Sequence, residues 1–169
     1  MPFELRPYPT PTLRPDGQYL QNAWRNSVYP LAAQLGVEIR LPQVSPQPYT
    51  RLAFEGLEFA KEHGRGDAYN SAVMRAFFQR SENIGDAEVL TKTAEEVGLD
   101  EGAFRQALEA GTYSQRLGEL LRHAREDVRV TGVPLFLIGS ARLSGVQTRA
   151  TLEAAIDRAS TGALTGSRA

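Results

Sequence analysis

The sequence predicts a mixed α/β chain, and three observations support this fold class. Residues 18–35 and 49–128 place apolar side chains at helical spacing, with Gly or Asp near the ends of the predicted helices. An apolar run, residues 133–138, is too short for a helix and is followed by a glycine turn and a second short strand. A last helix follows, so the predicted order is strand, long helix, block of helices, hairpin and terminal helix.

Composition limits the possible classes of function. The chain has 169 residues, 41% hydrophobic and 23% charged, as in a soluble protein with one core. The formal net charge of −1 gives no field that attracts nucleic acid or a membrane, and no apolar run could span a bilayer. We therefore expect a cytoplasmic protein. There is no cysteine, which excludes disulfides, thiolate metal sites and thiol chemistry by this chain.

The N-terminal part combines a short strand, a long helix and extended segments. Residues 3–6 (FELR) alternate in polarity and predict a strand. Residues 18–35 predict a helix that Pro30 should kink or split. Residues 37–42 are strand-like or extended, and residues 45–48 (SPQP) are a linker without regular structure.

The middle of the chain predicts a succession of helices. Asp86 can cap one of them, and Gly98 follows its last turn. The predicted helices cover residues 49–63, 68–79, 86–97, 100–109 and 114–128.

The C-terminal part predicts a hairpin and a helix. Residues 134–138 and 141–145 are its strands, joined by a turn at Gly139 and Ser140. A helix then covers residues 148–159, and residues 161–169 have the composition of a mobile tail.

Pro134, at the start of the first hairpin strand, is the most unusual residue of this pattern. An X-Pro bond adopts the cis form at modest cost, and proline donates no hydrogen bond to a sheet. Free backbone groups before Pro134 could therefore pair with an extended peptide. Gly132 allows close approach, and Val133 favours extended backbone. Alternatively, Pro134 simply begins an edge strand, where proline is tolerated.

Two longer stretches carry a resemblance to a known family. VTGVPLFLIGSARLSGVQTRATLEAAIDRA (130–159) resembles the closing ββα unit of thioredoxin-fold proteins of the DsbA type, and more closely their FrnE-like branch. FEGLEFAKEHGRGDAYNSAVMRAFFQRSENIGDAEVLTKTAEEVGLDEGAFRQAL (54–108) resembles that branch's inserted helical domain, including its NIGD turn. PFELRP (2–7) resembles the second strand of the core.

The resemblance implies an α/β fold with a thioredoxin-like core, incomplete at the N-terminus, and an inserted all-helical subdomain. Residues 1–44 and 128–160 would form the partial core, residues 45–127 the insertion, and residues 161–169 the tail. The family's first strand and helix, which carry its Cys-X-X-Cys motif, have no counterpart here. Either the chain is truncated or begins at a wrongly assigned start codon, so that the natural protein carries the missing strand and helix, or it is complete and has lost the catalysis.

The resemblance also implies a function in thiol–disulfide exchange on protein substrates, catalytically incomplete without Cys-X-X-Cys. No catalytic residue can be assigned; the residues that match the family's cis-proline loop, and would bind substrate, are Thr131, Gly132, Val133 and Pro134. The expected partner is an extended polypeptide. A homodimer is also expected, because a second copy would cover the surface left by the missing strand.

Two other functions remain open. The related kappa-class glutathione transferases and 2-hydroxychromene-2-carboxylate isomerases share the fold, and would make glutathione the cofactor. Those proteins carry an acidic and then a basic residue after the hairpin, where this chain reads Gly145-Val146-Gln147-Thr148. The third possibility is a non-catalytic module that binds peptides.

Other chemistry-bearing side chains receive structural assignments. His63 and His123 have no partner at metal-ligand spacing, so we expect no metal and no cofactor beyond the glutathione alternative. The remaining candidates are expected in the core or on a solvated helix face: Trp24, Phe77, Phe78, Glu95 and Glu96.

Overall fold

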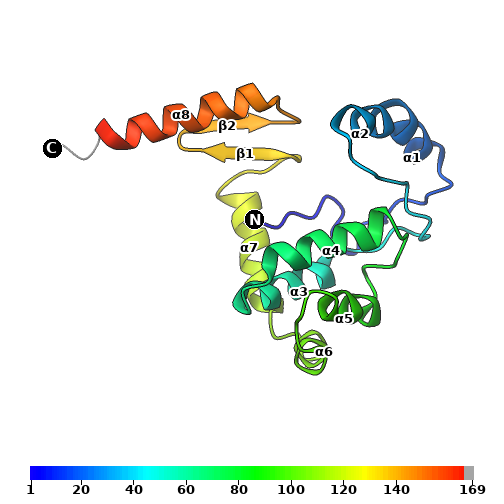
Figure 1. Ribbon diagram of the computed structural model, residues 1–169. Helices are drawn as coiled ribbons and strands as arrows, with labels where there is room; N and C mark the ends of the chain where they lie inside the picture. The colour runs from blue at the N-terminus through cyan, green and yellow to red at the C-terminus, as the bar shows by residue number, and fades with distance from the viewer. Residues whose placement is uncertain (166–169) are drawn as a thin grey trace. The chain divides into compact units, whose positions relative to one another are not determined.

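The computed structural model describes residues 1–165 of the chain (Figure 1). The chain divides into two compact units, one up to Leu121 and one from Arg122 onward, which are described separately. The elements of the first unit are α1 (Gln18–Ala23), η1 (Trp24–Val28), α2 (Tyr29–Leu35), α3 (Arg51–Glu62), α4 (Gly66–Phe78), α5 (Ala87–Glu95), α6 (Glu101–Glu109) and the start of α7 (Ser114–Glu126). The second unit contains the end of α7, β1 (Leu135–Ile138), β2 (Ala141–Ser144) and α8 (Arg149–Thr165).

Pro30 does not split the long N-terminal helix: helical residues run without a break from Gln18 to Leu35 through α1, η1 and α2. It has no N–H to donate to the preceding turn, and the chain passes through the π-helical segment η1 before α2 begins. Gly36 ends α2 in the left-handed conformation, with φ of 67°. The buried Trp24 ring contacts Tyr29 edge-on, with 5.3 Å between ring centroids.

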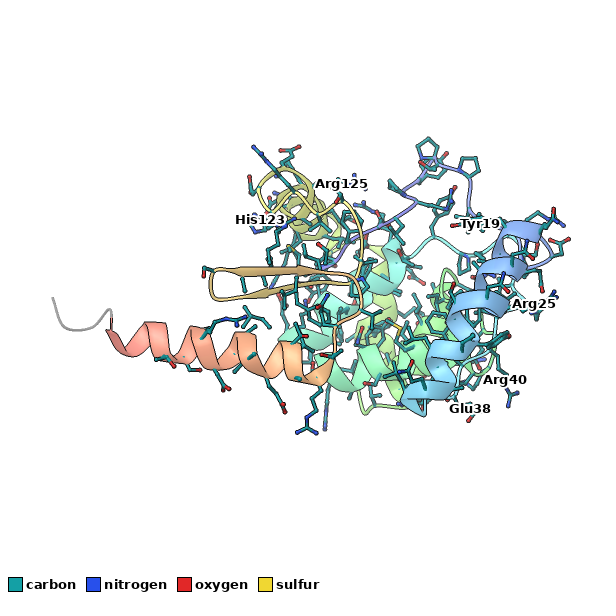
Figure 2. All side chains as sticks on the ribbon, turned by 90° about the horizontal axis from the view of Figure 1, so that it is seen from above. Tyr19, Arg25, Glu38, Arg40, His123 and Arg125 are labelled. Carbon is teal, nitrogen blue, oxygen red and sulfur yellow. The ribbon has the colours of Figure 1, made fainter. Side chains whose placement is uncertain are left out.

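Residues 37–42 are extended but form no strand. The Arg40 N–H donates to the Phe78 carbonyl at 2.8 Å, at the end of α4, and the Tyr29 hydroxyl accepts from the Leu41 N–H at 3.2 Å. The exposed Arg40 side chain pairs with Glu38 at 2.9 Å, beside the helices that carry Tyr19 and Arg25 (Figure 2). The segment is therefore held by individual hydrogen bonds rather than by a sheet.

Helices α3, α4, α5 and α6 pack together as a bundle (Figure 1). Their ends follow the sequence signals: Asp86 accepts from the Glu88 N–H at 2.8 Å, and Asp100 accepts from the Ala103 N–H at 2.7 Å. The core of the bundle consists mainly of aromatic and aliphatic side chains, among them Phe59, Tyr69, Leu90, Leu99, Phe104 and Leu108.

Buried carboxylates join the first turn of α7 to α3. Glu58, only 2% exposed, pairs with Lys61 and, at 3.1 Å, with Arg116 Nε. The Ser114 hydroxyl donates to Glu55 Oε1 at 2.8 Å. Glu55 and Glu58 thus both have charged or hydroxyl partners, as burial of a charge requires.

In the second unit, β1 and β2 form the predicted antiparallel hairpin, with Leu135 opposite Ser144 and Ile138 opposite Ala141. Helix α8 packs against β1 (Figure 1). Gly139, at the turn, has φ of 58°, and a Cβ there would lie 2.9 Å from that of Ala159. Thr148 caps α8 by accepting from the Thr151 N–H at 3.1 Å.

Two of the structural predictions are wrong. Residues 3–6 form no strand, because within residues 1–165 the sheet consists of β1 and β2 and offers them no partner. The expected tail at residues 161–169 is helical up to Thr165, since a single glycine costs a helix only about 1 kcal/mol. The rest of that tail, residues 166–169, lies outside the described residues. The division into residues 1–44 with 128–160 and residues 45–127 stays a prediction.

Candidate functional site

The four residues Thr131, Gly132, Val133 and Pro134 come together at one end of the hairpin, beside a pocket of about 160 Å³. All four are exposed, and the Val133–Pro134 peptide bond is cis. The hairpin completes the pocket with Leu135, Arg142, Ser144 and Gly145.

The missing N–H of Pro134 is compensated by a side chain. One step beyond the Leu135–Ser144 pair, the Gly145 N–H donates to the Pro134 carbonyl at 2.9 Å. Pro134 cannot return the bond, and the Gln147 carboxamide instead donates to the Gly145 carbonyl at 3.2 Å and to the Ser144 carbonyl at 2.8 Å. The Gln147 side chain therefore satisfies the two backbone carbonyl groups at this end of β2.

Arg142 fixes the chain that enters the pocket. Its Nη1 donates to the Val128 carbonyl at 2.7 Å and its Nη2 to the Arg129 carbonyl at 2.8 Å. Arg129 has φ of 53°, a conformation uncommon for a side chain of its size. Sequence reasoning missed Arg142 and Gln147; the alternation of ARLS, which directs residues 142 and 144 to one face, was the available signal for Arg142.

The backbone of the loop is free to bind. Within residues 1–165, the N–H groups of Thr131, Gly132 and Val133 have no hydrogen-bond acceptor, and apart from its two chain neighbours no residue lies within 4 Å of a Cβ built on Gly132. Extended polypeptide supplies both donors and acceptors to such a segment. The arrangement can therefore hold a peptide backbone, and Val133, 51% exposed, offers it an apolar contact.

The other candidate side chains are not among the residues that line this pocket. His63 contacts the Phe59 carbonyl at 2.8 Å, and the exposed His123 pairs with Asp127 at 2.7 Å on the helix that also carries Arg125 (Figure 2). Glu96 pairs with Arg80 at 3.3 Å. No group of three or more possible metal ligands occurs among the described residues. Nor does that part of the chain contain a helix long and apolar enough to cross a membrane.

Comparison with known proteins decides the family. The DSBA-like thioredoxin domain matches residues 3–157, which include both the helical bundle and the pocket. The chain belongs to the DsbA-like thioredoxin-domain family. Its mostly helical structure with a small sheet is the DsbA-like thioredoxin fold, an α/β core with a helical insertion.

Two similar proteins illustrate the family. The uncharacterized protein YwbO of Bacillus subtilis is 50% identical over 157 residues, covering 92% of this DsbA-like chain and 78% of YwbO. The crystal structure of a probable DsbA oxidoreductase from Streptomyces coelicolor superposes with a TM-score of 0.72 at 26% identity. That match covers 90% of this chain and 64% of the Streptomyces protein, so the chain spans less than two thirds of its length.

Proposed function

We propose that this chain is a FrnE-like member of the DsbA family and binds extended polypeptide substrates of thiol–disulfide exchange at Thr131–Pro134. The observation that carries the proposal is the exposed loop with unpaired backbone groups beside the pocket. The similarity to a probable DsbA oxidoreductase supports it. The NIGD and SGVQ segments favour the FrnE-like branch.

The proposal separates substrate binding from redox chemistry. Disulfide exchange requires an attacking thiolate, and the 169 residues contain no cysteine. The chain would therefore bind a cysteine-containing peptide without oxidising or reducing it. Redox turnover by the purified chain, at the rate of a Cys-X-X-Cys enzyme, would contradict this.

Peptide binding can be measured by fluorescence anisotropy with labelled, extended ten-residue peptides. Gly132→Leu should weaken binding about tenfold or more, because the new side chain would occupy the open space at the loop where the peptide is proposed to bind. The leucine would not clash with the protein itself. The matched control is Gly102→Leu, an exposed glycine of α6 that lies outside the pocket. Equal weakening by both variants, or by neither, would remove the loop as the binding site.

We also propose that the chain forms a homodimer through β1. Because Pro134 and Gly145 are a hydrogen-bonded pair, the alternation of the ladder turns the backbone groups of Leu135 and Leu137 toward the outer edge of β1. Neither strand has a second neighbour among residues 1–165, but Gln147 occupies the Ser144 carbonyl at the end of β2, which leaves β1 as the freer edge. A second copy could pair with this edge.

Light scattering during size-exclusion chromatography tests the dimer. The chain should elute with twice its 18.6 kDa mass, and Leu137→Lys should shift it toward the monomer. Ile156→Lys, at a similarly exposed position of α8, should leave the dimer intact. A compact monomer for the unsubstituted chain would overturn the proposal.

A further inference from the structure

We infer that Arg142 makes the loop selective for polypeptides that carry an acidic side chain next to the segment bound at Thr131–Pro134. This rests on the proposed peptide binding and adds to it the chemistry of the substrate. The inference starts from the position of Arg142, a permanently charged side chain that lines the same pocket as the loop.

Some hydrogen-bond donors of the Arg142 guanidinium group are not used within the protein. A guanidinium group has five N–H donors, and the bonds to the Val128 and Arg129 carbonyls use one from each terminal nitrogen. Among residues 1–165, no carboxylate lies within ion-pair distance of Arg142. The side chain is exposed, so the remaining donors can reach a ligand.

The two backbone bonds also hold Arg142 in place. An arginine on a surface loses side-chain entropy when it binds, which reduces the gain from an ion pair. Here the protein has already fixed the guanidinium group against two carbonyls. A carboxylate that meets it can form charge-assisted, bidentate hydrogen bonds with little further ordering.

The rest of the pocket wall is rich in donors. The N–H groups of Thr131, Gly132 and Val133 have no acceptor in the described part of the chain, and Ser144 adds a hydroxyl group. Negative charge is scarce nearby in the sequence. Residues 122–158 hold six arginines and four carboxylates, and Asp127 and Glu153 already pair with His123 and Arg149. The donors and the excess of arginine around the pocket therefore favour binding of an anion over binding of a cation.

The test uses pairs of labelled extended peptides that differ only by Glu or Gln, with the variable residue moved along the peptide. At one position of the peptide, the full chain should bind the Glu peptide about tenfold more tightly than the matching Gln peptide. A second such position could lie two residues further along, because side chains i and i+2 of an extended peptide lie on the same face. The ratio of the affinity for the Glu peptide to that for the Gln peptide should fall toward one as the salt concentration rises from about 0.05 to about 0.5 M. This salt titration needs no variant.

Variants assign the preference to Arg142. Arg142→Gln should bring the Glu/Gln affinity ratio to about one, while Arg142→Lys keeps part of it because the charge remains. The matched control, Arg158→Gln, removes an exposed arginine of α8 that has no partner among the described residues, and should keep the full ratio. Circular dichroism of each variant checks the fold.

The outcomes are distinguishable from those of the proposed function. Binding of Glu and Gln peptides with equal affinity at every position would overturn the inference and leave peptide binding intact. Failure of the chain to bind any peptide would overturn both. Arg142-dependent binding of free glutathione, without a preference among the peptides, would assign the carboxylate to a small molecule and overturn the acidic-polypeptide assignment.

Discussion

The hydroxyl group of Tyr69 lies directly against the backbone of Gly56, inside the helical bundle. Tyr69 is completely buried, and its Oη atom has no hydrogen-bond partner among the described residues. A Cβ atom on Gly56 would collide with that oxygen and would lie 2.7 Å from Cζ of Phe104. Glycine at position 56 is therefore required by the packing of α3 against α4 and α6.

Gly56→Ala should destabilise the protein. An added methyl group in a filled core forces neighbouring side chains from their rotamers, which costs about 1–3 kcal/mol. Urea unfolding followed by circular dichroism measures the loss. An unchanged midpoint would mean that the core around Tyr69 is looser than the structure has it.

Gly118→Ala should have the opposite effect. Gly118 lies in the interior of α7, and apart from its chain neighbours and the nearby backbone of α7 itself, no atom lies within 4 Å of a Cβ built on it. Alanine in a helix interior is more stable than glycine by about 1 kcal/mol, so the unfolding midpoint should rise. A lower midpoint would indicate that α7 is distorted or crowded at this position.

Tyr69→Phe should be neutral or stabilising at pH 7, because it removes a buried hydroxyl group that makes no hydrogen bond. Burial also raises the pKa of Tyr69 far above its ordinary value of about 10. Above pH 10 the unfolded chain loses this proton while the folded chain keeps it. Stability should then fall by about 1.4 kcal/mol per pH unit on account of Tyr69.

Unfolding measured between pH 9 and 11 (about one unit on either side of the ordinary tyrosine pKa) checks this slope. Tyr69→Phe should make the decline shallower. Part of it should remain, because burial and the hydrogen bond to Glu62 raise the pKa of Tyr113 to about 12. An identical pH profile for the variant would contradict the burial of the Tyr69 hydroxyl group.

Arg116→Gln should destabilise the junction of α3 and α7 by about 2 kcal/mol, since it leaves the buried Glu58 with Lys61 alone. A double-mutant cycle with Glu58→Gln separates this pair from other effects of Arg116. The matched control is Arg105→Gln on α6, which removes ion pairs to half-exposed carboxylates and should cost about 1 kcal/mol or less. Additive losses in the cycle would exclude a coupling between Arg116 and Glu58.

Local signals in the sequence were sufficient for most of the helices. Asp86 and Asp100 begin helices where the capping rule expects them. Pro30, by contrast, does not split the N-terminal helix, which continues through a π-helical segment. The hairpin at Gly139 also follows from turn chemistry. The strand predicted at residues 3–6 failed because strands need a neighbour, and alternation within four residues carries no information about one.

The sequence named only some of the residues that lie at the candidate site. The motif located residues 131–134, and the structure gathers them at one pocket. It did not identify Arg142 or Gln147, because their contacts are with backbone carbonyls whose positions depend on the register of the hairpin. Side chains that bind backbone leave no charge pattern or spacing that a sequence search could find.

Amide hydrogen exchange in the presence of substrate peptide tests the central claim most directly. With peptide at about 100 times its dissociation constant, exchange of the Thr131, Gly132 and Val133 amides should slow about a hundredfold, because these unpaired N–H groups gain acceptors. Amides of α5 and α6, which lie outside the pocket, should exchange as before. Unchanged exchange at residues 131–133 with saturating bound peptide would contradict the account.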